Sequence, residues 1–393
     1  MKINLAVLFG GKSVEHEISV ISAIQAINNL NTDKYNIFPI YITKNNEFFY
    51  GEVLKNIDEF RNIPELIKKC EQVSFISNNN RVELISFNKV FFSKKHITNI
   101  DIALPIVHGT NVEDGTLQGY LKTLNLPFVG CDVLSSAVCM DKYVMKILLK
   151  QAGFPVLDCL RFLRKDCIDV EKMISNVEQN FKYPVIVKPV NLGSSVGIGK
   201  ACNSSELETA FSEAFVFADK VIVEPAVVNI KEINCSVVGD LDEAIASECE
   251  EPVASDEILS YSDKYMDGSK ANGSKGMASL KRKIPADISP DLREKIRTIA
   301  VDAFKHLDCN GVVRIDFLMD SNTGDFWINE FNTIPGSLAF YLWEPVGLKY
   351  SALLERMISL ALKRQRESED ITYSFETNIL SAGKSFGFKG GKL

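Results

Sequence analysis

The chain has 393 residues, a length that predicts two or three compact units at about 100–200 residues per domain. Apolar residues make up 46% of it and charged residues 24%, which is typical of a globular protein and excludes disordered, collagen-like and disulfide-scaffold classes. The net charge of −7 argues against a nucleic-acid-coating surface but leaves room for a local basic site around phosphates.

The first segments predict a β–α–β unit. Residues 3–9 form a short apolar run, typical of a buried parallel strand, that ends at Gly10-Gly11. Residues 18–30 carry helical periodicity, and residues 37–42 predict a second strand. Such a unit implies a parallel sheet that binds ligands beyond the carboxyl ends of its strands. The opening apolar run is too short for a secretory leader.

Beyond this unit the patterns are less regular. Residues 44–100 predict a surface elaboration, and residues 102–107 predict another buried strand. Residues 135–151 have the spacing of one continuous helix, followed by Gly153 as a stop signal. Further elements are predicted on the same grounds, with strands at 184–188, 221–224 and 233–238 and helices at 204–218, 290–307 and 348–364. Residues 262–283 predict a long loop, and the glycine- and lysine-rich tail receives no function.

The cysteines give no sign of a metal or redox site. There are nine, and none stands in a CxxC pair, so zinc-ribbon and thioredoxin-like sites are excluded on spacing. An odd number without a leader fits a reducing cytosol, in which thiols act as small core hydrophobes. No stretch reaches the roughly 20 apolar residues of a membrane span. We therefore expect a cytoplasmic protein without a membrane partner.

A candidate phosphate site follows one predicted strand. The strand ends at Lys188 and is followed by the glycine- and serine-rich loop 191–197. Glycines let backbone N–H groups approach phosphate oxygens, and the lysine adds a point charge. The segment is not a Walker A loop, because no GK[ST] follows the glycines. The alternative is a Gly-Ser hairpin beside a solvated lysine.

A second candidate site lies on a predicted hairpin formed by residues 312–319 and 326–332. The strand period of two places Arg314 with Asp316 on one face, and Glu330 with Asn332 on one face. If the two faces coincide, three oxygen-bearing side chains converge beside a guanidinium. Such hard ligands suit Mg²⁺, which typically keeps substrate phosphates in its shell. The alternative is a polar sheet face with an ordinary arginine–carboxylate pair.

Three further residues have two interpretations each. Glu15 follows the glycine turn, where it could be a helix N-terminal charge or could hold a substrate ammonium. His108 is first interpreted as a structural histidine with satisfied hydrogen bonds. Lys142 lies within the helix predicted over 135–151, where it could be solvated or could face phosphate.

Taken together, the segments resemble the D-alanine–D-alanine ligase family of ATP-grasp enzymes. The match runs through GGKSVEHEIS, VHGTNVEDGTLQG, VIVKPVNLGSSVGIGK, GVVRIDFLMD and INEFNTIPG, and it omits only about residues 45–100 and the tail. It implies an α/β (α+β) ATP-grasp fold with an N-terminal parallel-sheet, Rossmann-like domain. The implied units are a substrate domain over 1–130, a lid domain over 131–228, a catalytic domain over 229–366 and a mobile tail over 367–393.

The resemblance also implies an activity. Members join two D-alanines for peptidoglycan precursor synthesis: the first carboxylate attacks the ATP γ-phosphate, and the second amine displaces phosphate from the acyl phosphate. The implied cofactors are ATP and two Mg²⁺ ions, with Mn²⁺ as an alternative. The implied assembly is a homodimer in the cytoplasm, with small-molecule substrates and neither nucleic acid nor membrane as partner.

Residue roles follow from the matching motifs. Glu15 would bind the first D-alanine's ammonium near His108, and Ser194 and Tyr265 would complete its hydrogen-bonded set. Arg314 and the N–H of Gly336 would stabilise the tetrahedral oxyanion. The nucleotide would be held by phosphate-facing Lys142 and Lys188, by Ser195 and Lys264, by Glu224 at the adenine amino group and by Glu232 at the ribose. The metal ligands would be Asp316, Glu330 and Asn332.

One departure from the family pattern affects the acceptor. A Thr/Ser-rich stretch normally follows the NTxPG motif, and here the chain places Tyr341 where the carboxylate-binding serine would stand. A phenol could donate the same bond, but it is bulkier. The alternatives are therefore ligation to another acceptor, such as D-serine, D-lactate or another amino acid, and a non-catalytic nucleotide-binding relative. Tyr265 favours an amine acceptor, and the loops at 191–197 and 262–283 are the candidate lids.

Overall fold

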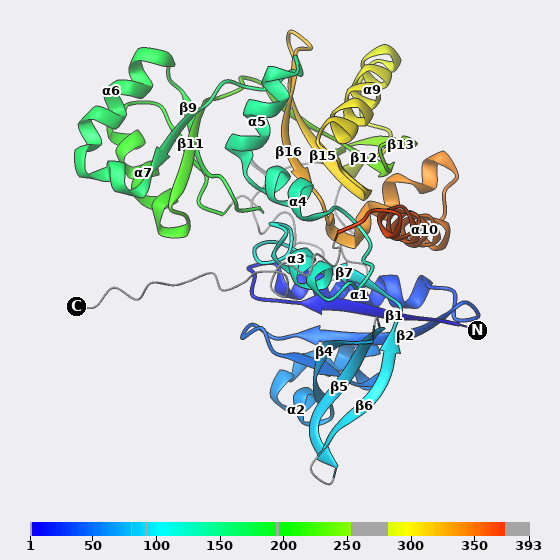
Figure 1. Ribbon diagram of the computed structural model, residues 1–393. Helices are drawn as coiled ribbons and strands as arrows, with labels where there is room; N and C mark the ends of the chain where they lie inside the picture. The colour runs from blue at the N-terminus through cyan, green and yellow to red at the C-terminus, as the bar shows by residue number, and fades with distance from the viewer. Residues whose placement is uncertain (1, 80, 91–92, 194–195, 253–281, 374–393) are drawn as a thin grey trace, which may run out of the picture.

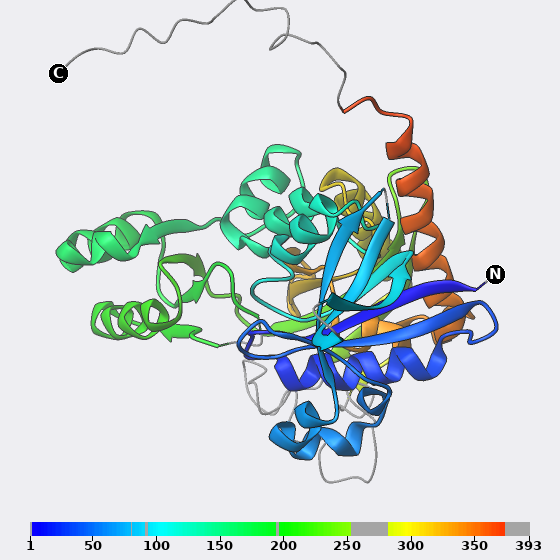
Figure 2. The same cartoon turned by 60° about the horizontal axis from the view of Figure 1, so that its bottom comes forward.

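The computed structural model describes residues 2–79, 81–90, 93–193, 196–252 and 282–373. Three sheets organise them: a seven-stranded, a four-stranded and a five-stranded sheet. Figure 1 shows the first sheet at the bottom, the second at the upper left and the third at the upper right, and Figure 2 shows the second projecting from the rest. The central region where the three approach one another is where the site residues lie.

The first sheet contains the predicted β–α–β unit. Strand β1 (Ile3–Gly10) pairs in parallel with β2 (Tyr35–Ile42) and β7 (Ile102–Ile106), and helix α1 (His16–Asn29) connects β1 to β2. Gly10 and Gly11 both have positive φ, +97° and +89°, which side chains disfavour. The glycine turn predicted between strand and helix is therefore confirmed.

The expected surface elaboration over 44–100 is instead an extension of this sheet. Strands β3 to β6 continue the sheet from β2 with antiparallel pairing, which gives the whole sheet the order β6-β5-β4-β3-β2-β1-β7. The reason is alternating burial: Val73, Phe75, Val82 and Leu84 join the first core. The bounds are β3 (Phe48–Tyr50), β4 (Glu71–Asn78), β5 (Arg81–Val90) and β6 (Ser93–Ile100), with helices α2 (Ile63–Lys68) and α3 (Thr116–Thr123) nearby in the chain.

The second sheet is small and carries its own core. Its strand order is β10-β9-β11-β8, and its apolar side chains pack against α6 and α7. The bounds are β8 (Leu160–Leu163), α6 (Val170–Asn180), β9 (Val185–Pro189), β10 (Gly199–Ala201), α7 (Ser204–Phe217) and β11 (Lys220–Pro225). Strand β9 ends next to Lys188 as predicted, and β11 brings Glu224 alongside it.

The third sheet has the order β14-β13-β12-β15-β16, and helix α9 (Pro290–His306) covers one face. The predicted hairpin is confirmed as β15 and β16, which pair antiparallel. The strands are β12 (Ile230–Gly239), β13 (Ala244–Pro252), β14 (Arg282–Lys283), β15 (Gly311–Asp320) and β16 (Phe326–Asn332). Five cysteines are buried in this core, which supports their interpretation as small hydrophobes: Cys131, Cys139, Cys235, Cys249 and Cys309.

The single helix predicted over 135–151 is wrong. The segment forms two helices, α4 (Val133–Met140) and α5 (Lys142–Gln151), separated at Asp141. Asp141 has an extended backbone, and its carboxylate accepts hydrogen bonds from the N–H groups of Tyr143 and Val144. Aspartate caps a helix N-terminus well, so the chain starts a new helix there. Lys142 therefore becomes the first residue of α5.

Core membership also bears on the proposed division into units. The buried residues of α4 and α5, including Met145 and Leu149, belong to the core of the third sheet. The C-terminal helix α10 (Tyr350–Glu369) packs into the first core through Leu353 and Met357. We therefore propose that α4 and α5 are grouped with the third sheet. The boundary at residue 366 also moves, because α10 continues to Glu369, and the other boundaries stay as proposed. Among the described residues no helix combines the length and apolarity needed to cross a membrane.

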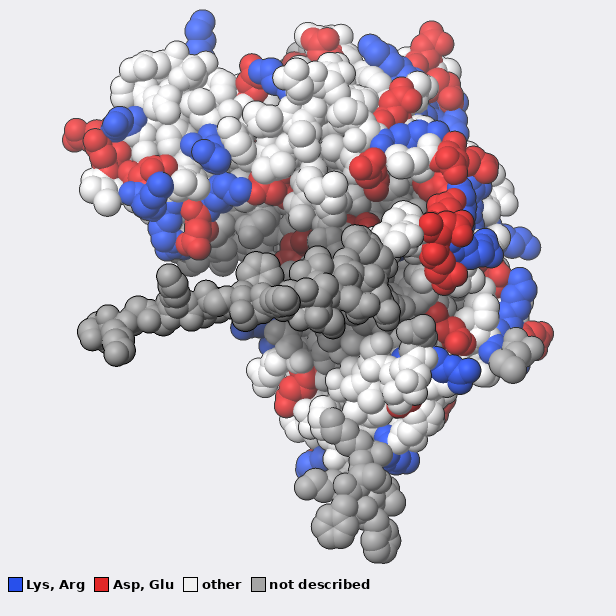
Figure 3. Space-filling model, viewed as in Figure 1, with Lys and Arg blue, Asp and Glu red and all other residues white. Residues whose placement is uncertain are grey.

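One face of the described surface carries charges of both signs. On the face in Figure 3, basic and acidic side chains alternate over the region of α9 and α10. The coloured residues of that face form no broad field of one sign, in keeping with the small net charge.

Candidate active site

Four polar side chains lie in register across the third sheet. Glu250 on β13 is the partner of Asn234 on β12, Asn234 is the partner of Asp316 on β15, and Asp316 is the partner of Glu330 on β16. Directly opposed residues of antiparallel strands point to the same side of a sheet. We call these four residues the polar row. The two faces of the predicted hairpin therefore coincide, and the row continues over two more strands.

The opposite face of the same strands is apolar. Cys235, Ile315 and Phe331 alternate with the polar residues and pack into the core beneath α9. This contrast fixes the register, because a slip of one residue would exchange the buried apolar face for the polar one. The polar row is thus a fixed feature of the fold.

Arg314 and Asp316 form a bidentate ion pair at the centre of this face. Nε of Arg314 lies 2.6 Å from Oδ1 of Asp316, and Nη2 of Arg314 lies 2.7 Å from Oδ2 of Asp316. Their exposed fractions are only 8% and 1%. Burial lowers the pKa of the guanidinium, but the charge of Asp316 outweighs it and holds that pKa well above its ordinary value. Arg314 therefore carries a permanent positive charge in the site.

The three predicted metal ligands lie together. Asp316 and Glu330 are cross-strand partners, and Nδ2 of Asn332 donates to Oδ2 of Asp316 at 2.9 Å. That bond points the amide nitrogen at Asp316. The described residues contain no group of three His, Cys, Asp or Glu that could hold a metal. The predicted set has two carboxylates, and the Asn332 amide would supply the third oxygen. Two carboxylates and an amide fit a hard cation such as Mg²⁺.

Two predicted lysines border the β16 end of the polar row. Lys142 Nζ lies 3.2 Å from Oε2 of Glu330 and donates to the Leu192 carbonyl at 2.8 Å. Lys188 Nζ lies 2.6 Å from Oε2 of Glu224 and donates to Oδ1 of Asn329 at 3.0 Å. Both lysines are buried. Two cations held against carboxylates can attract and neutralise phosphate oxygens.

Glu224 is held by lysines on both sides. Its second oxygen pairs with Nζ of Lys146 at 2.7 Å, and Glu224 is 1% exposed. Burial raises the pKa of Glu224, but Lys146 and Lys188 outweigh it and lower that pKa overall. The contact expected between Glu224 and the adenine amino group remains a prediction. What the structure shows is the ion pair that positions Lys188. Glu232 lies further along β12, opposite Leu318.

Sequence reasoning missed Lys146 and Asn329. Lys146 follows Lys142 by four residues and so lies one helical turn further along α5, a signal that the sequence contains. Asn329 reaches the site because the pairing of β15 with β16 slips between Asp316 and Phe317, which leaves Asn329 as an extra residue. Such a bulge adds a residue to one strand and cannot be read from a period of two.

Glu15 is enclosed by two glycine-containing loops. It directly precedes α1, makes no capping bond with its side chain and is buried. A Cβ on Gly109, whose φ is +82°, would lie 3.3 Å from Oε2 of Glu15, and a Cβ on Gly193 would lie 3.5 Å from the same atom. Burial argues against a solvated helix-end charge. The loop that leads to Ser194 thus reaches Glu15.

His108 is fully hydrogen-bonded inside the protein. Nδ1 lies 2.7 Å from the Ile334 carbonyl, and Nε2 lies 3.0 Å from Oγ of Ser22. The carbonyl requires a proton on Nδ1, so Nε2 accepts from the serine, whose Oγ accepts from the N–H of Ser337 at 2.9 Å. Burial, the largest influence, lowers the pKa of His108. These contacts support the structural interpretation.

This network supports an unusual turn. Ser337, Leu338 and Ala339 all have φ near +50°, within the short 3-10 segment η6 (Gly336–Leu342). A left-handed residue other than glycine costs roughly 1–2 kcal/mol. Gly336 lies at one end of the turn and Tyr341 close to the other. The phenol of Tyr341 donates to Oε1 of Glu250 at 3.2 Å. The sequence led us to expect that this phenol would donate to the carboxylate of the acceptor substrate, but in the structure it donates to a residue of the polar row.

Replacing Ser22 with alanine should loosen this turn. The change leaves the buried N–H of Ser337 and Nε2 of His108 without their partner, which typically costs about 1–3 kcal/mol of stability. Urea unfolding of the Ser22→Ala variant should show that loss, and turnover per folded molecule should also fall because Gly336 is displaced. The exposed Ser351→Ala variant on α10 is the control. Equal stability of the two variants would contradict the role of Ser22.

Glu113, a residue that sequence reasoning missed, links the two sides of the site. Its carboxylate accepts from the N–H of Gly109 at 2.7 Å and from the N–H of Ile334 at 3.0 Å. Burial, followed by the negative charge of Glu15, raises the pKa of Glu113 to about 8. The only available signal was its place in VHGTNVEDGTLQG.

This shift predicts a pH dependence of stability. Between pH 4.5, the ordinary pKa of a glutamate, and the raised pKa of about 8, Glu113 keeps its proton in the folded chain and loses it in the unfolded chain. The free energy of unfolding should therefore fall as pH rises through this window, by at most about 1.4 kcal/mol per pH unit. Urea unfolding in metal-free buffer should give a shallower slope for Glu113→Gln than for the unchanged chain. Parallel slopes would exclude the shift.

Four predicted residues lie outside the described residues: Ser194, Ser195, Lys264 and Tyr265. The same holds for most of the candidate lid over 262–283 and for most of the tail. Their roles stay predictions.

Comparisons with known proteins find similarity over most of the chain. The pattern of the D-ala D-ala ligase N-terminus matches residues 4–131, and that of the D-ala D-ala ligase C-terminus matches residues 148–359. A D-alanine–D-alanine ligase of Thermosipho melanesiensis is 39% identical over 378 residues, covering 96% of this chain and 98% of that protein. One of Geobacillus thermodenitrificans is 38% identical over 385 residues, covering 96% and 100%.

Solved structures are similar over the same length. The D-alanine-D-alanine ligase of Coxiella burnetii superposes with a TM-score of 0.78 at 31% identity, covering 94% of this chain and 96% of that one. The VanG D-Ala:D-Ser ligase of Enterococcus faecalis superposes with a TM-score of 0.76 at 33% identity, covering 92% and 100%.

Proposed function

The chain belongs to the D-alanine–D-alanine ligase family, and we propose that it joins two D-alanines to D-alanyl-D-alanine through an acyl phosphate. It is a ligase with an ATP-grasp fold, and its family depends on ATP and uses Mg²⁺. The observation that carries the proposal is the polar row with Arg314 at its centre and two buried lysines at its β16 end. The product would serve peptidoglycan precursor synthesis.

The nucleotide side of the reaction needs positioning and charge neutralisation. Phosphoryl transfer makes little demand for protein nucleophiles, so fixed cations suffice. We assign Lys142 and Lys188 to the phosphates, since both are buried and held within ion-pair distance of carboxylates. Asp316, Glu330 and Asn332 would hold Mg²⁺, which supplies neutralisation of phosphate charge when bound. The ion pair with Glu224 holds the Lys188 ammonium in place.

The donor amino acid is proposed to bind at the N-terminal end of α1. Glu15 would pair with its ammonium, because this buried carboxylate lies where the loops of Gly109 and Gly193 meet. Arg314 would face the carbonyl oxygen that becomes an oxyanion, assisted by the N–H of Gly336. Donors prepositioned for developing charge often make the largest catalytic contribution. Excluding water protects the acyl phosphate from hydrolysis.

One experiment tests this function directly. D-alanine, ATP and Mg²⁺ should suffice for steady ADP release, and mass spectrometry should find one D-alanyl-D-alanine per ADP. ADP release that needs a second compound would instead support another acceptor. D-serine comes first among these, since the chain resembles a D-Ala:D-Ser ligase and carries Tyr341 at the departure from the family pattern. Nucleotide binding without product in any mixture would support the non-catalytic alternative.

The finer assignments are also proposals. Two Mg²⁺ ions per site, with Mn²⁺ as a substitute, would be counted by calorimetric titration in the presence of a non-hydrolysable ATP analogue. A homodimer would appear by light scattering as twice the chain mass of 43.8 kDa. A cytoplasmic location agrees with the lack of a membrane-crossing helix among the described residues and would be tested by cell fractionation.

A further inference from the structure

Each end of the polar row pairs a carboxylate with a cationic side chain from a different element. At the β16 end, Glu330 lies beside Lys142. At the β13 end, Glu250 lies beside Arg282 of the edge strand β14. Strands are about 4.8 Å apart, so three strand spacings separate Glu250 from Glu330 by roughly 14 Å. Arg314 lies between the two ends. The β16 end, with its lysines, is the side proposed for phosphate, and the β13 end, with Arg282, is a second cationic side.

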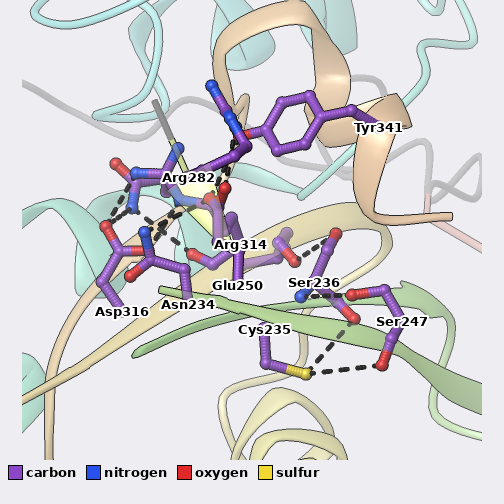
Figure 4. Close-up of polar contacts among 11 residues, drawn as sticks. Asn234, Cys235, Ser236, Ser247, Glu250, Arg282, Arg314, Asp316 and Tyr341 are labelled. Atoms are coloured by element: carbon purple, nitrogen blue, oxygen red, sulfur yellow. Dashed lines mark hydrogen bonds and ion pairs between the residues drawn. The ribbon is translucent and has the colours of Figure 1, made fainter. Parts of the chain in front are cut away.

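Glu250 organises this second side. Glu250 is 2% exposed, and its carboxylate accepts hydrogen bonds from three partners: Nη1 of Arg282 at 2.7 Å, the phenol of Tyr341 at 3.2 Å and Nδ2 of Asn234 at 3.4 Å. Figure 4 shows these residues gathered with Arg314 and Asp316 on one side of the strands. The carboxylate thus anchors side chains from three separate elements.

Arg282 is held in a defined orientation. Its guanidinium lies 3.9 Å from the centre of the Tyr341 ring while bonded to Glu250. Stacking on an aromatic face and pairing with a buried carboxylate both restrict a long side chain. A guanidinium has five N–H donors on its edges, so a bond to Glu250 is compatible with pairing a second carboxylate.

Asn234 provides an acceptor without a partner. Its exposed fraction is 3%, and Oδ1 makes no hydrogen bond within the described part of the chain. The bond from Nδ2 to Glu250 sets which way the amide faces. An unsatisfied buried acceptor is costly, so a ligand N–H at this position would be favoured. The register places Asn234 between Glu250 and Asp316, beside the centre of the reaction.

The left-handed turn adds an independent observation. Three consecutive strained residues, Ser337 to Ala339, lie between Gly336 and Tyr341. Such strain persists where surrounding structure enforces it and is concentrated at functional sites. Tyr341 comes shortly after this turn, and its ring lies against Arg282.

We propose that the β13 end of the polar row binds the acceptor amino acid, with Arg282 pairing its carboxylate and Asn234 Oδ1 accepting a hydrogen bond from its amine. This inference rests on the proposed ligation and names the residues that select its second substrate. The acceptor amine then lies beside Arg314, on the side opposite the lysines. Tyr341 acts as a positioning residue that fixes Arg282, in place of the direct carboxylate contact expected from its position in the sequence.

The test is a competition between acceptors. D-Alaninamide has the amine of D-alanine but no carboxylate, so it can act only as acceptor. With both compounds present, mass spectrometry gives the ratio of D-alanyl-D-alanine to D-alanyl-D-alaninamide. Arg282→Gln should lower this ratio at least tenfold, and Arg282→Lys should lower it less, because a lysine keeps the charge but loses the fork. The KM for ATP should stay unchanged.

Lys283→Gln is the matched control. It removes one positive charge from the next residue of β14, where Lys283 pairs with Glu251. An unchanged ratio in any Arg282 variant that turns over would overturn the proposal. If Arg282→Gln is inactive, equilibrium dialysis with a non-hydrolysable ATP analogue decides: two bound D-alanines per chain would overturn it, and one would support it. If the unchanged enzyme makes no dipeptide from D-alanine, the proposed function itself fails.

Discussion

Glu330→Gln should reduce dipeptide synthesis at least about a thousandfold while the protein stays folded. Glu330 is the end of the polar row nearest the lysines, with Asp316 as its cross-strand partner and Lys142 Nζ 3.2 Å away. The change removes the negative charge that would hold a divalent cation and orient Lys142. Because Lys142 is only 7% exposed and loses its charge partner, the free energy of unfolding should fall by about 1–3 kcal/mol, which leaves the protein folded.

Two measurements separate this effect from general damage. Turnover is measured by ADP release with D-alanine, and Mg²⁺-dependent nucleotide binding is measured by calorimetry. Both should fall in Glu330→Gln, whereas Asp302→Asn, which removes a carboxylate from the exposed side of α9, should leave both unchanged. Wild-type-like turnover in Glu330→Gln would exclude the metal role.

Arg314→Gln should damage both stability and activity. Arg314 neutralises Asp316, which is 1% exposed, and removing one partner of a buried pair typically costs about 3–5 kcal/mol. Turnover per folded molecule should fall about a hundredfold or more, because a donor that faces the developing oxyanion is lost. Arg314→Lys should keep most of the stability through its charge but lose the bidentate geometry, and with it much of the turnover.

Urea unfolding and ADP release on the same samples test this expectation. The exposed Arg366→Gln variant of α10 controls for the loss of one positive charge. If Arg314→Gln unfolds at the urea concentration of the unchanged chain, then Asp316 is not held by Arg314. If Arg314→Lys retains full turnover, the guanidinium fork has no catalytic part.

Local sequence patterns were enough to predict the hairpin and the shared face of its polar side chains. The alternation in GVVRIDFLMD and FWINEFN placed Arg314, Asp316, Glu330 and Asn332 correctly, because a strand period of two is a property of the backbone. The glycine turn after β1 and the strand ending near Lys188 were predicted on equally local grounds. The break at Asp141 was missed because apolar periodicity continues across it, although aspartate is a favoured cap.

Contacts between distant segments were beyond such patterns. Asn234 and Glu250 join the polar row only because β12 lies between β13 and β15, an order that no local period encodes. Arg282 and Tyr341 are 59 residues apart in the sequence, and both bond to the Glu250 carboxylate on a third element. His108 was left open, and only its bonds to Ile334 and Ser22 favour the structural interpretation.

By itself the sequence determined the types of element, the family resemblance and the set of oxygen and cationic groups available for phosphate chemistry. These depend on short-range backbone geometry and on ordered motifs. The tertiary structure decided which groups neutralise one another, where the register is shifted by a bulge and how Tyr341, after a left-handed turn, meets Arg282. Those outcomes depend on burial and Coulomb interactions between strands far apart in the chain, which arise only when the sheets have formed.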